Sequence, residues 1–408
     1  MHVHVVGAGL AGLSAALALT DAGCAVTLVE AAPVAGGRCR SYFDRELGIR
    51  VDNGNHLLLS GNRAAFRYID DIDARHTLAM PDKPCFPFMD LASGTRWTVR
   101  PNGGRIPWWV LSRQRRAPGT HATDHLALLR LRRITTDATV EASLRHDAFY
   151  RRLIEPLAIA SLNTPSNVAL VRLFNAVVAD TLFKGGNACI PAVPREGLSE
   201  SLVDPALARL AERGCAVLMG RRVAALRTVA DRVSDLETTD GPVPVERVVL
   251  AVPPWVAADL LPDQRYPTEF QAILNIHFQV EARLDPPGFI GLIGGTAEWV
   301  FAKRDHVSVT ISAANRMVDQ DAESIARAVW PDVRTALDLD SAMPPWRVVK
   351  ERRATVAATA AQERRRPGPR TALANLVLAG DWTDTGLPGT IEGAIRSGRT
   401  AAEVLLAA

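Results

Sequence analysis

The alternation of apolar and polar residues at the start of the chain predicts a strand, a helix and a second strand. Residues 2–6 form a short β-rich run, a glycine-rich turn follows it, and residues 13–22 have a helical pattern. The second strand covers residues 24–29 and ends at Glu30. A strand–helix–strand unit of about thirty residues that opens with Gly-x-Gly-x-x-Gly is typical of a dinucleotide-binding fold.

The rest of the chain alternates between helical and strand-like segments, with loops expected around the prolines between residues 81 and 107. Helical patterns are expected at residues 64–72, 125–133, 168–183, 319–329 and from 390 onward. Strand-like patterns are expected at residues 216–218, 223–226, 233–237, 245–252, 272–284, 307–312 and 375–379. This order predicts an α/β protein in which a Rossmann-type domain is interleaved with an α+β domain.

That interleaving assigns five chain segments to two discontinuous domains. The nucleotide-binding domain would be assembled from residues 1–58, 190–260 and 372–408. Residues 59–189 and 261–371 would form the substrate-binding domain over the cofactor. The helical part of this second domain could face a membrane.

Composition and charge narrow the class of protein. Of the 408 residues, 48% are hydrophobic and 22% are charged, as in an ordinary folded protein. The 47 Lys and Arg residues exceed the 44 Asp and Glu residues by only three, which argues against nucleic acid as a partner. The five cysteines form no Cys-x-x-Cys pair, so neither a disulfide framework nor a metal site is expected. No leader and no run of ~18 apolar residues is apparent, so we expect a cytoplasmic protein that could contact the inner face of a membrane.

The glycine turn and the acid after it carry the first candidate chemistry. Gly9 would let the backbone approach a diphosphate, and Gly12 would let the helix pack closely on the strand. The start of the helix offers free N–H groups to the phosphates, and Glu30 would accept hydrogen bonds from the ribose hydroxyls. The residues predicted to bind the dinucleotide here are Gly7, Gly9, Leu10, Ala11, Gly12 and Glu30.

Two later segments favour FAD over NAD as the dinucleotide. Gly36, Gly37 and Arg38 suit a loop that passes close to a diphosphate, with the arginine adding positive charge. Far downstream a Gly-Asp turn ends a buried strand and a second helix begins, an arrangement that serves a flavin and that a nicotinamide enzyme does not need. The candidate residues there are Gly380, Asp381, Pro388, Thr390 and Ile391. Because residues 380–390 contain neither His nor Cys, we expect FAD to bind non-covalently.

At these segments the chain resembles the superfamily of flavin-dependent amine oxidases and carotenoid desaturases. The resemblance covers the first sixty residues, residues 217–254 and the final forty. Residues 52–59, 162–165 and 385–398 more closely resemble the squalene-associated flavoproteins of bacterial hopanoid biosynthesis, the hydroxysqualene dehydroxylases. Two positions depart from that pattern: Asn55, where glutamine is expected, and Gly389, where alanine is usual.

The resemblance implies a reaction and several site residues. Such enzymes reduce a triterpene allylic alcohol to squalene, which requires protonation of the leaving hydroxyl and hydride from reduced flavin to the allylic cation. By this resemblance Gly54, Asn55 and His56 would lie along the flavin ring, while the backbone of Val223 would contact the adenine side and Ile391 would face the pyrimidine edge. His56 is the candidate proton donor. A purely structural role for His56 and another acid, Asp180 among them, stay open.

An isoprenoid lipid substrate also needs an apolar channel and access to a membrane. The aromatic residues expected to wall such a channel are Phe86, Phe88, Trp97, Trp108, Trp109 and Phe174. Residues 108–116 and 126–133 combine apolar side chains with arginines, so they could form an amphipathic surface that rests on anionic lipid. A solvated arginine face is the alternative. Nothing in the sequence indicates the electron donor of the flavin.

Other activities stay open at this point. A carotenoid or dehydrosqualene desaturase would use the flavin in the oxidising direction. An amine oxidase has few candidates for its lysine and aromatic cage, because the chain has only four lysines and four tyrosines. A non-redox flavin mutase and a catalytically silent flavin-binding partner that escorts lipid are further alternatives.

Overall fold

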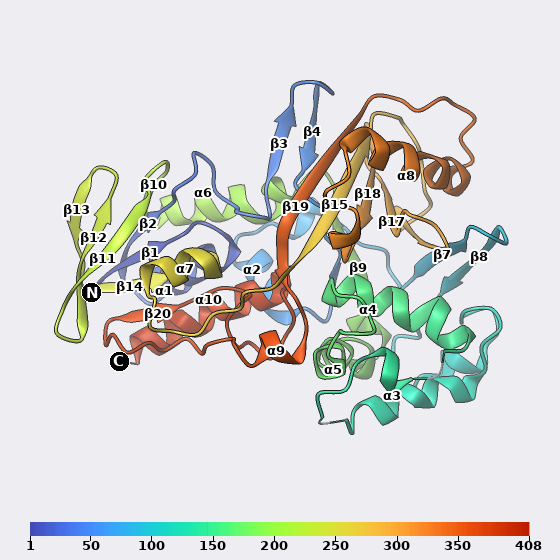
Figure 1. The fold of residues 1–408 in the computed structure, drawn as a ribbon, viewed down its shortest axis with the longest axis horizontal. Coiled ribbons are helices and arrows are strands. Elements are labelled where there is room, and N and C mark those ends of the chain that lie inside the picture. Colours follow the sequence, from blue (N-terminus) through green and yellow to red (C-terminus); the bar gives the residue numbers. More distant parts are fainter. Residues whose placement is uncertain (135, 145, 408) are drawn as a thin grey trace.

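The cofactor side of the molecule is built on a five-stranded parallel sheet. The computed structural model describes residues 1–134, 136–144 and 146–407. The strands lie in the order β10 (Ala216–Leu218), β2 (Ala25–Val29), β1 (His2–Val6), β14 (Arg247–Leu250) and β20 (Leu376–Leu378), and neighbouring strands are parallel. The predicted strand–helix–strand unit and the α/β class are confirmed. The sheet draws on distant parts of the chain (Figure 1), while the limits of the two domains stay a prediction.

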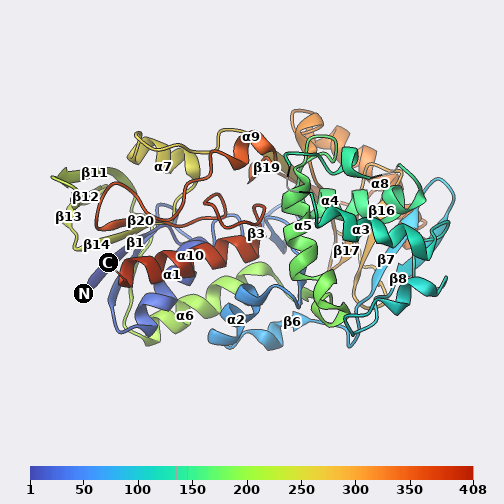
Figure 2. The ribbon, with the colours of Figure 1, turned by 90° about the horizontal axis from the view of Figure 1, so that it is seen from below.

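Helices cover one face of this sheet. They are α1 (Leu10–Asp21), α2 (Arg63–Asp71), α6 (Asp204–Glu212) and α10 (Ile391–Leu406), and Figure 2 shows them as neighbours. Val5 and Leu28 point from the strands into the apolar core beneath these helices. Helices α1 and α10 cross closely because residue 398 is glycine: a Cβ there would lie 2.0 Å from the Ala11 carbonyl oxygen.

The opposite face of the sheet packs against smaller elements. Residues that alternate with the previous set, such as Val6 and Leu250, point into this second core. The covering elements are α7 (Pro254–Leu260) and a small antiparallel sheet of β11 (Val223–Val229), β12 (Arg232–Thr238) and β13 (Gly241–Pro244). The inner strands β1 and β14 and the edge strand β20 are therefore enclosed on both sides, as parallel sheets require, whereas the edge strand β10 stays partly exposed.

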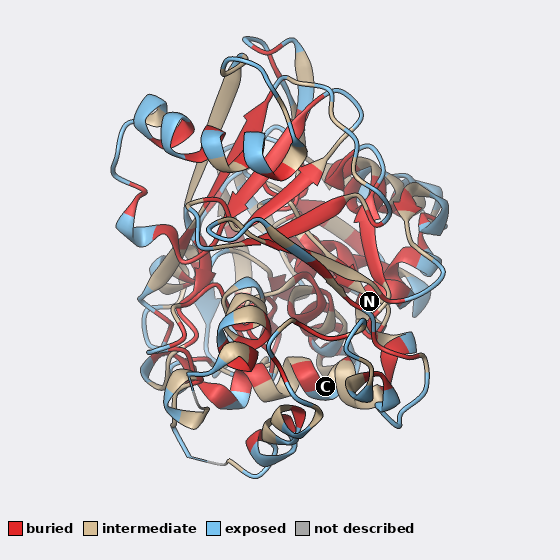
Figure 3. Ribbon diagram, turned by 90° about the vertical axis from the view of Figure 1, so that its right-hand side faces the viewer, coloured by how far each residue is buried: buried red, intermediate tan, exposed pale blue. Residues whose placement is uncertain are grey.

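A seven-stranded sheet forms the centre of the other half. Its order is β19 (Trp346–Val356), β15 (Phe270–Phe278), β18 (Val307–Ile311), β17 (Trp299–Ala302), β16 (Phe289–Ile293), β7 (Phe86–Asp90) and β8 (Thr95–Val99). All neighbours are antiparallel except β16 and β7. Helix α8 (Ala322–Leu337) packs on one face, and the strands are largely buried (Figure 3).

Part of this sheet differs from the sequence prediction. Loops were expected around the prolines of residues 81–107, but Phe86 and Phe88 pair with strand β8 on either side of Pro87, so the strand continues through the proline. The strand expected at 272–284 ends at Phe278. Strands β16, β17 and β19 were not predicted, because their apolar runs are short or, in β19, interrupted by charged residues.

A helical region and three small elements complete the fold. The helical region consists of α3 (Leu126–Leu131), α4 (Glu155–Leu162) and α5 (Val171–Asp180), with short α9 (Ala360–Glu363) nearby. The small elements are the hairpin β3 (Ser41–Asp44) and β4 (Ile49–Asp52), and the pairings of β9 (Pro191–Pro194) with β5 (Leu58–Leu59) and β6 (Leu78–Ala79). No helix in the described ranges is long and apolar enough to cross a membrane.

Candidate cofactor and active site

The predicted glycine turn joins β1 to α1, and each glycine has a different reason to lack a side chain. Gly7 has φ +105°, and a Cβ there would lie 2.5 Å from the Ala251 carbonyl oxygen. A Cβ at Gly12 would lie 1.8 Å from the Gly7 carbonyl oxygen, so the helix could not approach the strand. Around Gly9, by contrast, nothing lies within 4 Å of the Cβ position. This open space beside the first turn of α1 fits a diphosphate.

Glu30 stands at the carboxyl end of β2, next to the glycine turn. Its carboxylate accepts hydrogen bonds from the backbone N–H of Ala8 (2.7 Å) and of Ala32 (2.8 Å). The Glu30 carbonyl accepts one from the N–H of Arg221, two residues before the buried Val223. The structure thus brings together the two residues predicted for the adenosine part of FAD, and Glu30 also braces the turn itself.

The loop of Gly36, Gly37 and Arg38 joins the N-terminal and C-terminal cofactor segments. Gly36 has φ +101° and donates its N–H to the Ala8 carbonyl oxygen at 2.8 Å. Arg38 forms an ion pair with Asp381 (2.5 Å), whose side chain is only 7% exposed, and also donates to the Ala354 carbonyl. Arg38 was expected to add positive charge for a diphosphate. The carboxylate of Asp381 offsets that charge, so the pair acts first as a link between the segments.

Arg366, which the sequence analysis left without a function, organises the C-terminal cofactor loop. Its side chain is 3% exposed and pairs with the carboxylate of Glu363 at 2.9 Å. The guanidinium also donates to the carbonyl oxygens of Asp381 (2.9 Å) and Leu387 (2.6 Å) and to the Thr385 hydroxyl (3.0 Å). A single buried cation therefore shapes the loop that leads from the Gly-Asp turn to α10.

The loop ends at the start of α10, where the remaining predicted residues lie. Thr390 is the N-cap of α10, and its hydroxyl accepts a hydrogen bond from the Gly393 N–H at 3.1 Å. The buried Ile391 opens the helix, directly after Pro388 and Gly389. A Cβ at Gly389 would lie 3.0 Å from the Asp381 carboxylate, so glycine, where the resemblance led us to expect alanine, relieves a tight contact.

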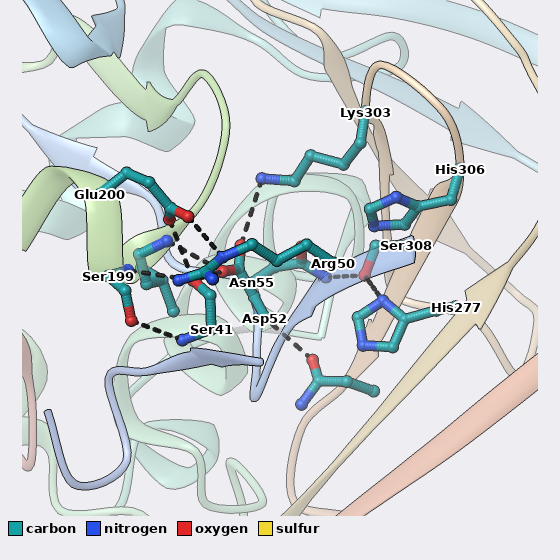
Figure 4. Close-up of polar contacts among 12 residues, drawn as sticks. Ser41, Arg50, Asp52, Asn55, Ser199, Glu200, His277, Lys303, His306 and Ser308 are labelled. Carbon is teal, nitrogen blue, oxygen red and sulfur yellow. Dashed lines mark hydrogen bonds and ion pairs between the residues drawn. The ribbon is translucent and has the colours of Figure 1, made fainter. Parts of the chain in front are cut away.

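The turn of residues 53–56 is held by buried polar side chains of the seven-stranded sheet (Figure 4). Asn275 donates from Nδ2 to the Asn53 carbonyl oxygen (3.1 Å) and accepts at Oδ1 from the Asn55 N–H (3.4 Å). These backbone partners fix which side of the Asn275 amide is oxygen. The Thr310 hydroxyl therefore donates to Asn275 Oδ1 (2.9 Å) and accepts from Asn55 Nδ2 (3.0 Å).

A second cross-strand pair extends this network. His277 pairs with Ser308 across β15 and β18, one step along from Asn275 and Thr310. Asn55 Nδ2 donates to Ser308 Oγ (2.7 Å), so the Ser308 hydroxyl donates to His277 Nδ1 at 2.9 Å. The intervening residues of both strands point into the apolar core on the opposite face. These four side chains were not predicted, although a polar residue at every second position of two apolar strands is a signal that the sequence contains.

A buried ion pair lies at the base of the same turn. The side chains of Asp52 and Lys303 are 6% and 7% exposed, and Lys303 Nζ lies 3.6 Å from the Asp52 carboxylate. Asp52 also accepts from the Ser41 hydroxyl (2.6 Å) and the Leu198 N–H (2.9 Å). Asp52 therefore anchors the turn.

No cluster of His, Cys, Asp and Glu that could hold a metal ion occurs among the described residues.

The two candidate acids have different environments. The partly buried imidazole of His56 makes no hydrogen bond that we find within the described chain. Burial lowers its pKa to about 4; the nearby carboxylate of Asp52 opposes this shift, and the positive charges of Arg38 and Lys303 add to it. Asp180 pairs with Lys184 (2.6 Å) and Arg396 (3.0 Å), whose hydrogen bonds hold its pKa below the usual value despite partial burial. Asp180 is therefore ionised at neutral pH and has no proton to give.

Five of the six aromatic residues expected to wall one channel share one apolar cluster, with Phe86 packed against its edge, and the sixth, Trp108, is exposed. Phe88 and Trp97 stack at 5.8 Å and line a cavity of about 1050 Å³ beside β7 and β8. Trp109 and Phe174 are buried in the core of the helical region. Trp108 is half exposed, and the guanidinium of Arg115 lies 4.6 Å from its ring centre. Of the six, Phe88 and Trp97 line the cavity, whereas Trp108 lies outside the shared cluster.

The family model described as flavin containing amine oxidoreductase matches residues 10–406. Among solved structures, an oxidoreductase from Methanosarcina mazei has a TM-score of 0.76 at 15% identity, over 99% of this chain and 100% of that chain. Together with the open glycine turn, these findings define a flavin-dependent oxidoreductase that takes FAD.

Two curated relatives narrow the family further. "Hydroxysqualene dehydroxylase" of Rhodopseudomonas palustris is 46% identical, over 100% of this chain and 98% of the relative. The protein of the same name from Zymomonas mobilis is 44% identical, over 99% of this chain and 98% of the relative. The chain belongs to the flavin-containing amine oxidoreductase family and, within it, to the group of the hydroxysqualene dehydroxylases.

Proposed function

We propose that this protein reduces hydroxysqualene to squalene with FAD as cofactor, as a step of squalene and hopanoid biosynthesis. The observation that supports this most strongly is the full-length similarity to curated hydroxysqualene dehydroxylases at 43–46% identity. In this reaction the C–O bond breaks, the oxygen leaves as water with an added proton, and a hydride forms the new C–H bond. FAD, once bound and reduced by a donor, supplies that hydride.

The chain's own task is to hold the flavin and the turn beside it. We propose that Glu30 accepts hydrogen bonds from the ribose hydroxyls and that the open glycine turn receives the diphosphate. The residues proposed to contact FAD are the candidates predicted from the sequence, of which Gly7 is the first and Ile391 the last. We propose that FAD binds to them without a covalent link. Asn275 and Thr310 would act as positioning residues, because they fix the backbone and the amide of Asn55 from the opposite sheet.

We propose that His56 acts on the leaving hydroxyl. Its imidazole lies in the turn assigned to the flavin ring, and no protein partner occupies its ring nitrogens in the described structure. With a pKa of about 4 it is neutral at pH 7, yet its protonated form is a better proton donor than an ordinary imidazolium. If this form donates the proton, single-turnover rates should rise about tenfold for each pH unit below neutral until about pH 4.

The variant His56→Gln tests that role. It should keep its flavin but lose the pH dependence and a general-acid factor of roughly 10²–10⁴ in rate. The assay mixes anaerobically reduced protein with hydroxysqualene and follows flavin reoxidation per mole of bound flavin, while oxygen as acceptor should be used as before. The matched control is His76→Gln at an exposed position. A parental rate and pH profile in His56→Gln would remove His56 from the catalytic residues.

Product analysis tests the reaction itself. Reduced protein incubated with hydroxysqualene should yield squalene by mass spectrometry, in an amount equal to the flavin reoxidised. Oxidised protein incubated with squalene should leave the substrate unchanged. Dehydrosqualene in the second incubation would instead establish a desaturase, and the absence of any product in both would contradict the proposed function.

We also propose that the protein works at the cytoplasmic face of a membrane. Residues 105–133 contain seven arginines and one aspartate, which gives this segment a net charge of +6. Because the whole chain has a net charge of only +3, all other residues together have a net charge of −3. The same segment exposes five large apolar side chains: Ile106, Trp108, Leu111, Leu126 and Leu129. Exposed apolar side chains among arginines suit an anionic bilayer.

Flotation with vesicles tests the membrane contact. The protein should float with phosphatidylglycerol vesicles and not with phosphatidylcholine vesicles. The double variant Leu111→Ser/Leu126→Ser should bind less, while Val229→Ser, at an exposed apolar residue on β11, should bind like the parent. A parent protein that stays in solution with both lipids would refute this location.

A further inference from the structure

The cavity of about 1050 Å³ beside β7 and β8 has a mixed lining that neither FAD nor a hydrocarbon explains. It lies between β7, β8, β16 and the loop of residues 113–121, and its wall is formed in part by the buried rings of Phe88, Trp97 and Phe289. None of the residues proposed to contact FAD lines it. Its volume is at the upper end of the range for small-molecule sites, so it has room for a lipid-sized chain.

Four arginines and one carboxylate surround this apolar wall. Arg96 is close to an exposed carboxylate, with its guanidinium 3.4 Å from Asp338, and Arg116 donates to the Val110 carbonyl oxygen (2.6 Å). Arg100 and Arg113 are exposed and form no ion pair with any residue that the structure describes. The single acid in the lining is Asp285.

This combination selects the chemistry of a ligand. A plain hydrocarbon would gain nothing from the arginines, and a small anion such as phosphate would leave the aromatic wall uncovered. Guanidinium groups match phosphate oxygens, because their planar N–H groups can bind two of them at once. A molecule with a phosphate-bearing head and an apolar chain satisfies both parts of the lining.

The position of the cavity gives such a molecule a route of entry. Arg113, Arg116 and the loop up to His121 belong to the segment that carries the charge of +6 and the exposed Trp108 and Leu111. The mouth of the cavity therefore adjoins the surface that we propose to rest on lipid. An amphiphile held in a bilayer could enter chain first and keep its head among the arginines.

We propose that this cavity is a binding site for an anionic amphiphile, a hydrocarbon chain that ends in a phosphate or diphosphate. Two sources have this chemistry: a membrane phospholipid and an isoprenoid diphosphate. The site is separate from the proposed reaction, which involves an uncharged alcohol. Its occupant would be a lipid that the enzyme meets at the membrane rather than one that it reduces.

Calorimetry on the FAD-loaded protein tests the site with four probes. They are farnesyl diphosphate, short-chain phosphatidylglycerol kept below its micelle concentration, inorganic diphosphate and farnesol. At least one of the two amphiphiles should bind more tightly, by about tenfold or more, than either diphosphate or farnesol alone. Binding of farnesyl diphosphate only indicates an isoprenoid source, and binding of phosphatidylglycerol indicates a phospholipid source.

Variants at the rim separate the site from the fold and from catalysis. Arg100→Gln/Arg113→Gln should weaken amphiphile binding by roughly 10- to 100-fold, because the charge-assisted hydrogen bonds from the two guanidinium groups to the phosphate of the ligand are lost. Both side chains are exposed, so the core should not change. The matched control is Arg232→Gln/Arg370→Gln, at exposed arginines elsewhere. Both double variants should reduce detergent-dispersed hydroxysqualene like the parent. The proposal is overturned if neither amphiphile binds, if diphosphate alone binds as tightly, or if the rim variant keeps parental affinity.

Discussion

Replacing Glu30 with alanine should weaken the apoprotein as well as its hold on FAD. The Glu30 carboxylate accepts the N–H of Ala8, a residue that is fully buried, so water cannot replace this bond in Glu30→Ala. An unsatisfied buried N–H costs about 1–3 kcal/mol. The unfolding entropy is about 2.1 cal/mol/K per residue, and the chain has 408 residues. The lost free energy divided by this total entropy corresponds to a decrease in Tm of roughly 1–3 °C. The N–H of the partly exposed Ala32 can turn to water instead.

Loss of the ribose contacts adds a separate effect on the holoprotein. Each hydrogen bond to the carboxylate is worth about 1.5–3 kcal/mol, so FAD affinity should fall by roughly one to two decades. Glu30→Gln should lie between the parent and Glu30→Ala, because an amide oxygen can keep one of the backbone bonds. The control is Glu323→Ala, whose exposed pair with Arg327 contributes only about 0.3–0.5 kcal/mol.

Two measurements decide between the two effects. Thermal unfolding of the apoproteins reports the contact with Ala8, and titration of the apoproteins with FAD reports the ribose site. If Glu30→Ala unfolds like Glu323→Ala without cofactor, the bracing role of the carboxylate is wrong. If its FAD affinity equals that of the parent, the assignment of the ribose site is wrong.

Three further outcomes are expected. Arg366→Ala should destabilise the protein by about 3–5 kcal/mol in denaturant unfolding, because the buried Glu363 keeps only the half-exposed Arg172, 3.9 Å away, and the carbonyl oxygens of Asp381 and Leu387 lose their donor. The exposed Arg364→Ala should change little. Burial lowers the pKa of His277 to about 3, below the value of ~6.5 in the unfolded chain, so the unfolded state takes up the proton first as the pH falls. The free energy of unfolding should therefore decrease as the pH drops from about 6.5 toward 3. A denaturation midpoint that stays constant over that range would contradict this. Acid precipitation should release yellow FAD and leave a colourless pellet, since residues 380–390 hold no His or Cys for a covalent bond; a yellow pellet would show a covalent link.

The elements that were predicted from sequence are those whose signals are local. The first βαβ unit combines three glycines, an apolar strand on either side and an acid at its end within thirty residues, so its position and register follow directly. Helix α10 was likewise found from a Thr N-cap and a periodic apolar pattern. The strand through Pro87 was missed because its support comes from β8 and β16, which lie beside it only in the folded protein.

The missed site residues depend on distant neighbours in the same way. Arg366 follows Arg364 and Arg365 in the sequence, and no composition rule shows that only the third is buried against Glu363 and Asp381. Asn275 and Thr310 act on the turn after β4 through a pairing register that no single segment reveals. Their polar alternation could have marked them as unusual, but not what they contact.

The order of strands in the cofactor sheet has a consequence for synthesis on the ribosome. Strand β1 lies between β2 and β14, and the outer strand β20 and helix α10 are made after the other elements of this sheet and its helices. At roughly 5–20 residues per second, translation needs about 17–70 s to go from β2 to β20. Throughout that interval the apolar side of α1 lacks its cover and Arg38 lacks Asp381. We therefore expect the nascent chain to expose this apolar surface until β20 and α10 have been made, and FAD to bind firmly only once Asp381 has joined Arg38.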